Sequence, residues 1–412
     1  ALMSLGRTLA KRVKENPQSW GLQNTGTPGL VEPLNTAGML PTRNFLQGAF
    51  ENVDNVKWET YERDLLTARR SCYACAIRCK REVQVDGVPS VYGGPEYESL
   101  GALGPNCGVG DLQAIAKANE LCNAYMLDSI STGMTISFAM ECFEHGLLTL
   151  EDTDGLDLRF GNAEAMVMMV ERIALRQGLG DLLAEGVRRA AEKIGGEAHY
   201  FAIHVKGQEL PMHEPRGKYN VGMGYAISEI GADHLVVAHD SMLANAEAIP
   251  FKNARPLGIT DPQPVKSLND EKMRQFYVLE KVTSFEKVIG YCFFGPAPRS
   301  YIQMEEVLES VNAATDWDLT LEELLEIGER ATNLARVFNA REGFTRLDDV
   351  LPERLYAPLG NGALEGEVFP RDAFESALTV LYGLKGWNPE TGMPTRERLE
   401  SLSLGWAADL MD

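Results

Sequence analysis

The stretch Ser71–Cys79 reads SCYACAIRC, and its three cysteines follow the spacing C-x2-C-x3-C. This spacing places three thiolates on one compact turn, where they can point at a common centre. A cubane iron–sulfur cluster needs four sulfur ligands, so a fourth has to come from another part of the chain. Zinc can also be bound by three close cysteines and one distant ligand. Either metal would draw a second part of the chain to this turn.

The residues around the cysteines help to choose between the two metals. Five basic residues crowd the motif in an otherwise acidic chain: Arg69, Arg70, Arg78, Lys80 and Arg81. Cationic neighbours lower the pKa of a thiol and stabilise a reduced, more negative cluster. The basic flanks therefore favour iron–sulfur over structural zinc. Three cysteines at this spacing also argue against a third interpretation, in which they pack as small hydrophobic residues.

Four further cysteines are spread along the chain. Cys292 is the best candidate for the distant ligand, because its setting GYCFFG (residues 290–295) predicts a turn packed against aromatic rings. If Cys292 is the ligand, the cluster ties the N-terminal half to the C-terminal half and couples metal binding to folding. The other three lie on or beside predicted helices and are expected in the core: Cys107, Cys122 and Cys142.

The composition is that of a globular protein with a strong negative charge. The 412 residues include 39 Lys+Arg and 59 Asp+Glu, which gives a formal charge of −20 at pH 7. This charge argues against binding to nucleic acid, which needs a basic face. The longest apolar runs are too short to span a bilayer, and no signal peptide is visible. Together with the odd number of cysteines, these features lead us to expect a cytoplasmic protein.

Helical periodicity dominates the chain, and strand signals are few. We expect a mainly α fold of two helical domains with few short strands, residues 1–203 with the cysteine motif and 204–412 with Cys292, joined by a shared iron–sulfur cluster. Residues 26–44 predict a long loop, and 199–204 a short extended piece. Thr320 and Glu323 predict a capping box. Helices are expected over residues 4–15, 58–70, 111–126, 134–145, 163–177, 181–194, 270–285, 304–314, 321–340 and 371–384.

Stretches in order along almost the whole chain resemble the tungsten-containing aldehyde:ferredoxin oxidoreductase family. Besides the cysteine motif they are GMLPTRN (38–44), GPEYESLGAL (94–103), DSISTG (128–133), VKGQELPMHEPRG (205–217), GADH (231–234), GYC (290–292) and NAREGFTRLDDVLPER (339–354). The resemblance implies a [4Fe–4S] cluster on Cys72, Cys75, Cys79 and Cys292. It also implies a tungsten or molybdenum ion held by two pterins. The implied reaction oxidises an aldehyde to a carboxylate and passes electrons through the cluster to ferredoxin or another acceptor.

The resemblance also points to residues that handle protons. The family uses a glutamate after the third cluster cysteine, which corresponds to Glu96 or Glu98, and a histidine before the second pterin motif, which corresponds to His234. A carboxylate buried by a metal can hold its proton near neutral pH, and an imidazole can shuttle one. Outside this family, a glutamate in a turn is usually solvated and such a histidine is usually an ordinary polar residue.

Pterin binding is the other role that the resemblance assigns. Asp128 corresponds to the first acidic pterin-binding position, where a carboxylate accepts from pterin N–H donors, and it would also serve as a helix N-cap. Arg216 could clamp a pterin phosphate with its planar fork, or form an ion pair at the surface. Gly290 belongs to the second pterin motif. Weaker candidates for the site are His213, Glu214 and His239.

The sequence departs from the family pattern in two ways. The second pterin motif, D-x-x-G-L-C, reads KVIGYC over residues 287–292. Lys287 cannot accept from a pterin amine, so that contact is lost or replaced, with Glu286 the candidate. The chain also resembles only the second and third domains of the family. We therefore expect the pterin cofactor to be shared with an N-terminal domain that is missing here. The sequence leaves open whether that domain is a separate subunit, was removed or never existed.

Three functions stay open at this point. The first is the C-terminal helical portion of a tungsten or molybdenum bis-pterin oxidoreductase that acts on aldehydes. The second is a relative that reduces aryl-CoA thioesters. The third is a cluster-bearing electron-transfer or assembly subunit without tungstopterin chemistry of its own, and a helical interaction protein stapled by zinc is a more distant alternative.

Overall fold

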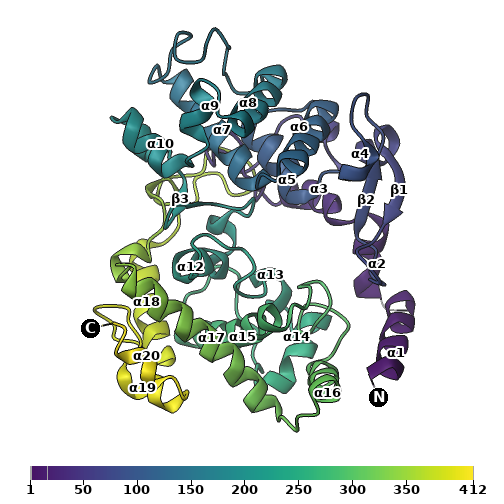
Figure 1. Ribbon diagram of the computed structural model, residues 1–412, viewed down its shortest axis with the longest axis vertical. Helices are drawn as coiled ribbons and strands as arrows, with labels where there is room; N and C mark the ends of the chain where they lie inside the picture. The colour runs from purple at the N-terminus through teal and green to yellow at the C-terminus, as the bar shows by residue number, and fades with distance from the viewer. Residues whose placement is uncertain (1, 16, 412) are drawn as a thin grey trace. The chain divides into compact units, whose positions relative to one another are not determined.

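The computed structural model describes residues 2–15 and 17–411, and the chain divides into two compact units. Unit 1 comprises Ala1–Trp20, Lys218–Val350 and Pro370–Asp412, and unit 2 comprises Gly21–Gly217 and Leu351–Phe369. The fold is mainly α, as predicted, and the described strands form two antiparallel pairs (Figure 1). Across these described residues, no helix combines the length and the apolar character needed to cross a membrane. The expected domain division at residues 203/204 stays a prediction.

Unit 2 holds the cysteine motif and both small sheets. Short 3-10 turns connect its elements, and α2 (Pro17–Asn24) lies where the ranges of the two units meet. The elements of unit 2 are α3 (Val31–Thr36), α4 (Trp58–Asp64), β1 (Leu66–Arg70), β2 (Lys80–Val83), α5 (Tyr97–Leu103), α6 (Leu112–Tyr125), α7 (Ser129–Glu144), α8 (Ala163–Leu175), α9 (Leu179–Leu183), α10 (Val187–Ile194), α11 (Ala198–Phe201), β3 (His204–Val205) and β4 (Gln208–Glu209).

Helix α7 forms the centre of unit 2. Its residues 132–142 are all buried, as expected for a helix surrounded by other elements. Gly133 allows α5 to come close, because a Cβ at this position would lie 2.6 Å from the backbone carbonyl of Ala102. Glu141 of α7 forms a buried ion pair with Arg354 at 2.7 Å. This pair binds the 351–369 segment to the core of unit 2.

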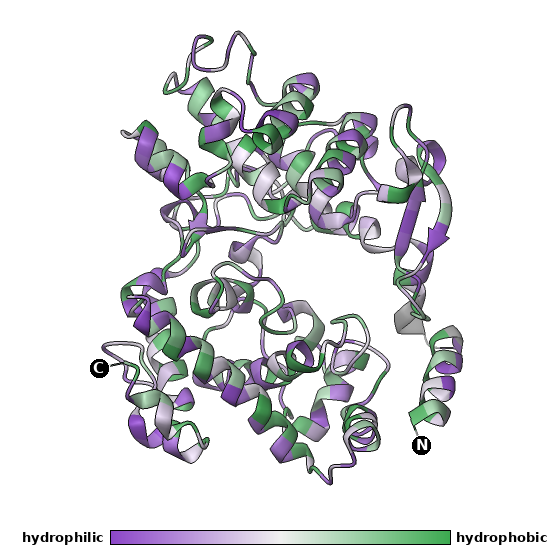
Figure 2. Cartoon of the chain, in the orientation of Figure 1, coloured by the Kyte–Doolittle hydropathy of each residue, from purple (hydrophilic) through white to green (hydrophobic). Residues whose placement is uncertain are grey.

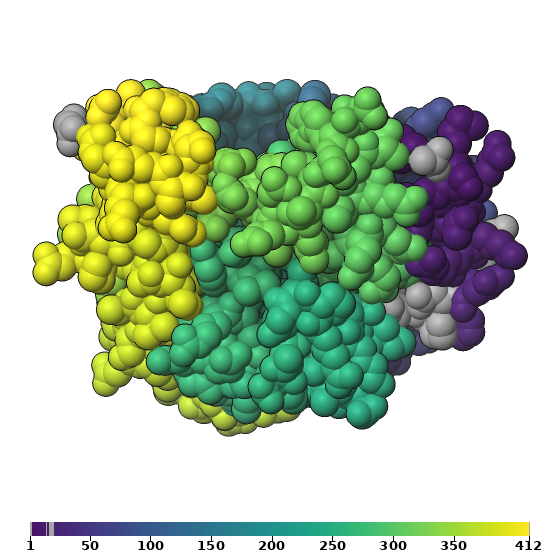
Figure 3. Space-filling model, turned by 90° about the horizontal axis from the view of Figure 1, so that it is seen from below, coloured from purple at the N-terminus to yellow at the C-terminus, as the bar shows by residue number. Residues whose placement is uncertain are grey.

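Unit 1 is built from helices that range from four to 21 residues in length. They are α1 (Leu2–Glu15), α12 (Tyr219–Ile227), α13 (Asp240–Leu243), α14 (Ile249–Ala254), α15 (Asp270–Ile289), α16 (Met304–Thr315), α17 (Leu321–Arg341), α18 (Arg371–Lys385), α19 (Arg396–Ser401) and α20 (Gly405–Ala408). Arg12 of α1 contacts Glu306 of α16 at 2.7 Å, and Figure 3 shows the purple N-terminal helix beside the green segment that contains α16. The capping box of Thr320 and Glu323 begins α17, as predicted.

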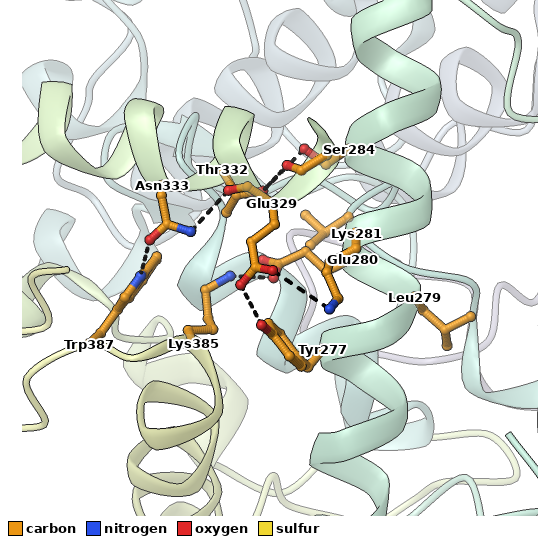
Figure 4. A network of polar contacts seen from close by, with 12 residues as sticks. Tyr277, Leu279, Glu280, Lys281, Ser284, Glu329, Thr332, Asn333, Lys385 and Trp387 are labelled. Atoms are coloured by element: carbon orange, nitrogen blue, oxygen red, sulfur yellow. Dashed lines mark hydrogen bonds and ion pairs between the residues drawn. The ribbon is translucent and has the colours of Figure 1, made fainter. Parts of the chain in front are cut away.

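A buried polar network links α15, α17 and α18 (Figure 4). Glu280 of α15 is ion-paired with Lys385 of α18, and Lys281 lies 3.6 Å from Glu329 of α17. Trp387, just after α18, donates from Nε1 to Asn333 at 2.8 Å. Each buried charge thus has an opposite charge beside it, as a low-dielectric interior requires. The network fixes how the three helices of unit 1 pack.

The structure corrects several predicted elements. Residues 27–36 form a 3-10 turn and α3 instead of an irregular loop, and residues 198–201 form α11 instead of an extended piece. The helix expected over 58–70 ends at Asp64, because β1 pairs with β2. The helix expected over 181–194 is broken at Gly186, whose φ of 84° leaves helical geometry.

Candidate functional site

The three clustered cysteines lie on the loop of the β1–β2 hairpin. Arg70 pairs with Lys80 in the antiparallel register, so residues 71–79 form a loop whose two ends are held together. Within the loop, the backbone N–H of Cys75 donates to the carbonyl of Cys72 at 3.1 Å. The strands of this hairpin are coloured mostly hydrophilic in Figure 2. The loop is therefore closed at its base by a polar hairpin, while its own Ile77 is buried.

The exposure of the cysteines divides them into two groups. Cys72 is exposed, and Cys75 and Cys79 are half-buried. By contrast Cys107, Cys122 and Cys142 are buried, as predicted, and burial raises the pKa of both the Cys122 and the Cys142 thiol to about 12. Buried thiols of that kind are inert. Three accessible sulfurs on one short loop are a donor set that fits three ligands of an iron–sulfur cluster or of zinc.

Arg81 holds the base of the loop in place. It is only 2% exposed, and its two Nη atoms donate to four backbone carbonyls. Nη1 contacts the carbonyls of Arg78 and Lys80 at 3.1 and 2.8 Å, and Nη2 those of Leu22 and Gln23 at 3.0 and 3.1 Å. Arg81 is therefore a structural clamp of the cysteine loop, a role that its place in a basic run did not reveal.

Lys80 is a basic residue whose charge interacts with two of the thiols. Partial burial acts to lower the pKa of its ammonium, but Glu96 and the thiols of Cys79 and Cys72 outweigh burial and raise that pKa. Its Nζ lies 3.1 Å from Oε1 of Glu96. The lysine therefore stays charged beside the cysteine loop, where a cation favours the thiolate form.

Of the two candidate glutamates, Glu98 is the one that contacts an imidazole. Its Oε1 lies 3.1 Å from Nε2 of His213, and its Oε2 accepts from the backbone N–H of Met212 at 2.8 Å. Glu96 instead binds Lys80 and the hydroxyl of Thr27. The structure thus places Glu98 and His213 together as a carboxylate–imidazole pair within unit 2, which can hold and pass a proton.

Asp128 and Arg216 both have structural contacts in unit 2. Asp128 caps α7, where its Oδ1 accepts from the N–H groups of Ile130 and Ser131 at 2.8 and 3.0 Å. Arg216 is 1% exposed and forms a two-bond ion pair with Glu214, at 2.8 and 2.9 Å. The ion pair is thus buried, not at the surface as one of our interpretations had it. The cofactor-binding roles of Asp128 and Arg216 stay predictions.

The guanidinium of Arg216 donates to two backbone carbonyls as well. Nη1 contacts that of Ala357 at 3.1 Å, and Nη2 that of Phe45 at 2.9 Å. These bonds connect three separate segments of unit 2. A residue with this many buried contacts contributes to folding whether or not it also binds a ligand.

The remaining candidates lie in unit 1. His234 follows Asp233, and its backbone carbonyl lies 2.9 Å from Nε2 of His239. Lys287, which stands where the family motif has aspartate, is ion-paired with Asp233 at 2.7 Å. Gly290 ends α15 in the left-handed conformation, with φ 72°, and the exposed Cys292 follows it.

Two charged groups near Cys292 were not singled out as a pair from the sequence. The Arg299 guanidinium lies 4.3 Å from the ring centre of Phe293 and 4.9 Å from that of Phe294, and it interacts electrostatically with Cys292 and Glu286. Burial lowers the pKa of Arg299 to about 10 and raises that of Glu286 to about 8. No sequence motif marks Arg299, whose aromatic neighbours give the only signal.

A family model described as aldehyde ferredoxin oxidoreductase, domains 2 & 3, matches residues 4–404. The tungsten-containing aldehyde ferredoxin oxidoreductases of Pyrococcus abyssi and Thermococcus kodakarensis are both 35% identical to this chain, over 412 and 410 residues, and each match covers 98% of this chain and 64% of the relative. The chain therefore spans about 64% of the length of these curated relatives.

Two further similarities are more distant. A protein of Pyrococcus furiosus named aliphatic sulfonate oxidoreductase, WOR-like subunit, is 28% identical over 382 residues, which cover 89% of this chain and 55% of that protein. The solved active-site complex of benzoyl coenzyme A reductase with 1,5-dienoyl-CoA matches with a TM-score of 0.78 and 21% identity, over 99% of this chain and 65% of the solved chain. At this identity the structural match supports the fold alone.

Proposed function

Because the chain belongs to the aldehyde ferredoxin oxidoreductase family, we propose that it forms the helical, cluster-binding part of a tungsten oxidoreductase that oxidises an aldehyde to a carboxylate. The observation that carries this proposal is the closed hairpin loop with its three accessible thiols, Cys72, Cys75 and Cys79. Tungsten, or molybdenum, held by two pterins would supply the two-electron chemistry. A [4Fe–4S] cluster would pass the electrons singly to ferredoxin or another acceptor.

The cluster requires a fourth sulfur, and we propose Cys292. Support comes from the family match, which includes residues 290–292, and from the exposure of the Cys292 side chain. Arg299 and Lys80 would each place a positive charge near a cluster ligand. Such charges favour the reduced, more negative form of a cluster.

We assign proton handling to Glu98, with His213 as its partner, and to His234. The 3.1 Å contact between Glu98 and His213 supports this choice over Glu96, which is tied to Lys80. A carboxylate that contacts an imidazole can receive a proton and share it with that ring. For the pterins, Asp128 offers a second oxygen, because its cap bonds both go to Oδ1. Arg216 and Gly290 would line the pterin site.

The cluster is tested on the purified 412-residue chain by anaerobic reconstitution with iron and sulfide. Wild-type protein should bind four irons, absorb broadly near 400 nm and give an EPR signal when reduced. Cys72→Ser, Cys79→Ser and Cys292→Ser should each lose iron or change the signal, whereas the buried Cys142→Ser should not. A colourless protein that binds one zinc, or unchanged spectra in Cys292→Ser, would contradict the assignment.

The reaction is tested on the enzyme expressed together with any pterin-binding partner encoded beside it. Elemental analysis should find tungsten or molybdenum besides iron, and a short aldehyde should reduce ferredoxin or an artificial viologen acceptor. Iron without tungsten, molybdenum or aldehyde-dependent reduction would instead support an electron-transfer subunit. Lys287 favours that second function, since its ammonium, paired with Asp233, occupies the family's acidic pterin position.

A further inference from the structure

A polar cavity lies in unit 2 between β2, the start of α5 and the C-terminal half of α6. Its volume is about 410 Å³, and most of the residues that line it are polar or charged. The wall contributed by α6 consists of Asn119 and Asn123, one helical turn apart, and β2 contributes Lys80 and Glu82. None of the catalytic, pterin-binding or cluster-ligand assignments above uses Asn119 or Asn123.

Asn119, in the wall of this cavity, is buried and has an amide nitrogen that is unpartnered in the part of the chain that the structure describes. Its side chain is only 4% exposed, yet its amide Nδ2 has no hydrogen-bond partner among the described residues. Its neighbour Asn123 is satisfied, since its Nδ2 donates to the carbonyl of Tyr92 at 3.0 Å. A buried N–H donor without an acceptor is costly and rare in folded proteins. Since Asn119 lines the cavity, an acceptor atom bound there could supply the partner that its amide lacks.

The charges around the cavity specify what kind of acceptor fits. The basic residues Arg70, Lys80 and Arg81 line it, against the acidic residues Glu82 and Glu96. Both carboxylates already contact a cation of the same wall, Glu82 with Arg70 at 2.6 Å and Glu96 with Lys80 at 3.1 Å. The lining thus keeps a surplus of one positive charge and of N–H donors in a chain whose net charge is −20.

We propose that this cavity binds a small oxyanion, a carboxylate or a phosphate, that accepts from Asn119 Nδ2 and lies beside Lys80. An oxyanion supplies the acceptor that Asn119 lacks and the negative charge that the basic wall favours, through charge-assisted hydrogen bonds. Lys80 directly follows Cys79, so the bound anion would also change the charge beside a proposed cluster ligand. That consequence rests on the proposed function, whereas the binding itself does not.

The binding is tested by calorimetric titration of the purified 412-residue chain with inorganic phosphate and, separately, with acetate, at constant ionic strength set by chloride. We expect saturable binding of at least one of them at a single site. Saturation by phosphate alone identifies a phosphate site, and saturation by acetate identifies a carboxylate site. No saturable binding of either anion up to about 20 mM would overturn the proposal, because such a site would be too weak to matter.

Variants show whether the site is the one described. Asn119→Leu removes the amide, and Asn119→Asp keeps its shape but repels an anion. Each should weaken binding about ten-fold or more, as expected for a lost hydrogen bond to a charged group. The melting temperature of Asn119→Leu without anion should stay the same or rise. Unchanged binding in both variants would overturn the proposal.

The role of the Lys80 charge can be tested with Lys252 as a matched control. Both are about half exposed and both contact one glutamate, Lys80 at 3.1 Å and Lys252 at 2.9 Å, but Lys252 does not line the cavity. Lys80→Met should weaken anion binding, and Lys252→Met should leave it unchanged. Equal weakening in both would show general attraction to the surface and would overturn a defined site. These titrations need neither cluster nor tungsten, so their failure and a failure of aldehyde oxidation are separate results.

Discussion

Nε2 of His213 lies 3.1 Å from Oε1 of Glu98, and the backbone N–H of Met212 holds the other carboxylate oxygen at 2.8 Å. His213 is also packed against Tyr97, with ring centres 5.3 Å apart. The pair is therefore fixed on both sides, by a peptide N–H on the carboxylate and by an aromatic ring on the imidazole. Fixed geometry of this kind is what a proton-transfer pair needs.

Glu98→Gln should lower aldehyde turnover of the complete enzyme about 100-fold or more, because the amide cannot take up the proton. Glu96→Gln, two residues away, removes the ion pair with the half-exposed Lys80, whereas its amide oxygen can still accept from the Thr27 hydroxyl, so it should cost little activity. The measurement is the steady-state rate, with iron and tungsten contents checked in both proteins. A slower Glu96→Gln enzyme beside an unaffected Glu98→Gln enzyme would reverse the assignment.

Arg216→Met should destabilise the chain by about 3 to 5 kcal/mol, since it leaves the buried carboxylate of Glu214 without its cation. The measurement is the free energy of unfolding of wild type and variant, both without cofactors. Arg70→Met, which breaks a pair at the exposed Arg70, is the control and should change stability by less than about 1 kcal/mol. If Arg216→Met were as stable as wild type, ligand binding would be its main role.

The sequence predicts this fold best where local periodicity decides the structure. Long amphipathic helices such as α6 and α17 follow from their apolar spacing and N-caps. The predicted helix over residues 66–70 was wrong. These residues continue a helical pattern, but they pair with residues 80–83 and form a strand. That pairing is set by tertiary contacts, which no local pattern contains.

The candidate site likewise has a part that local spacing predicts and a part that depends on the fold. The spacing of Cys72, Cys75 and Cys79 is local, so their place on one loop was predictable. The contact between Glu98 and His213 joins residues that are far apart in the sequence, as does that between Lys287 and Asp233. The sequence offered these residues as separate candidates, or not at all, because only the fold brings distant side chains together.

Two glycines test the packing of the helices. Gly133→Ala would place a methyl group 2.6 Å from the backbone of Ala102, so α5 and α7 would have to move apart, and we expect a loss of about 2 kcal/mol or more. Gly383, exposed in α18, has open space around its Cα, and Gly383→Ala should stabilise the chain by about 0.5 kcal/mol. Denaturant unfolding of both variants measures the difference. A neutral Gly133→Ala variant would mean that α5 and α7 pack less closely than described.

Glu286 should make stability depend on pH. Burial raises the pKa of its carboxyl to about 8 in the folded chain, against 4.5 for an ordinary glutamate. The folded protein therefore binds the proton more tightly than the unfolded protein does. The resulting stabilisation is fully present below pH 4.5 and is lost as the pH rises through 8.

Glu286→Gln should remove this dependence, because a glutamine stays neutral throughout. Relative to wild type, the variant should gain stability steadily between pH 5 and pH 9. The total gain should be up to a few kcal/mol, because a pKa difference of one between the folded and unfolded states corresponds to about 1.4 kcal/mol. The measurement is the free energy of unfolding of both proteins across this range. Glu323→Gln is the control, since the capping bonds of Thr320 lower the pKa of Glu323, and its effect should stay constant over the same pH values. A constant difference between Glu286→Gln and wild type would show that the carboxyl is already ionised at pH 5.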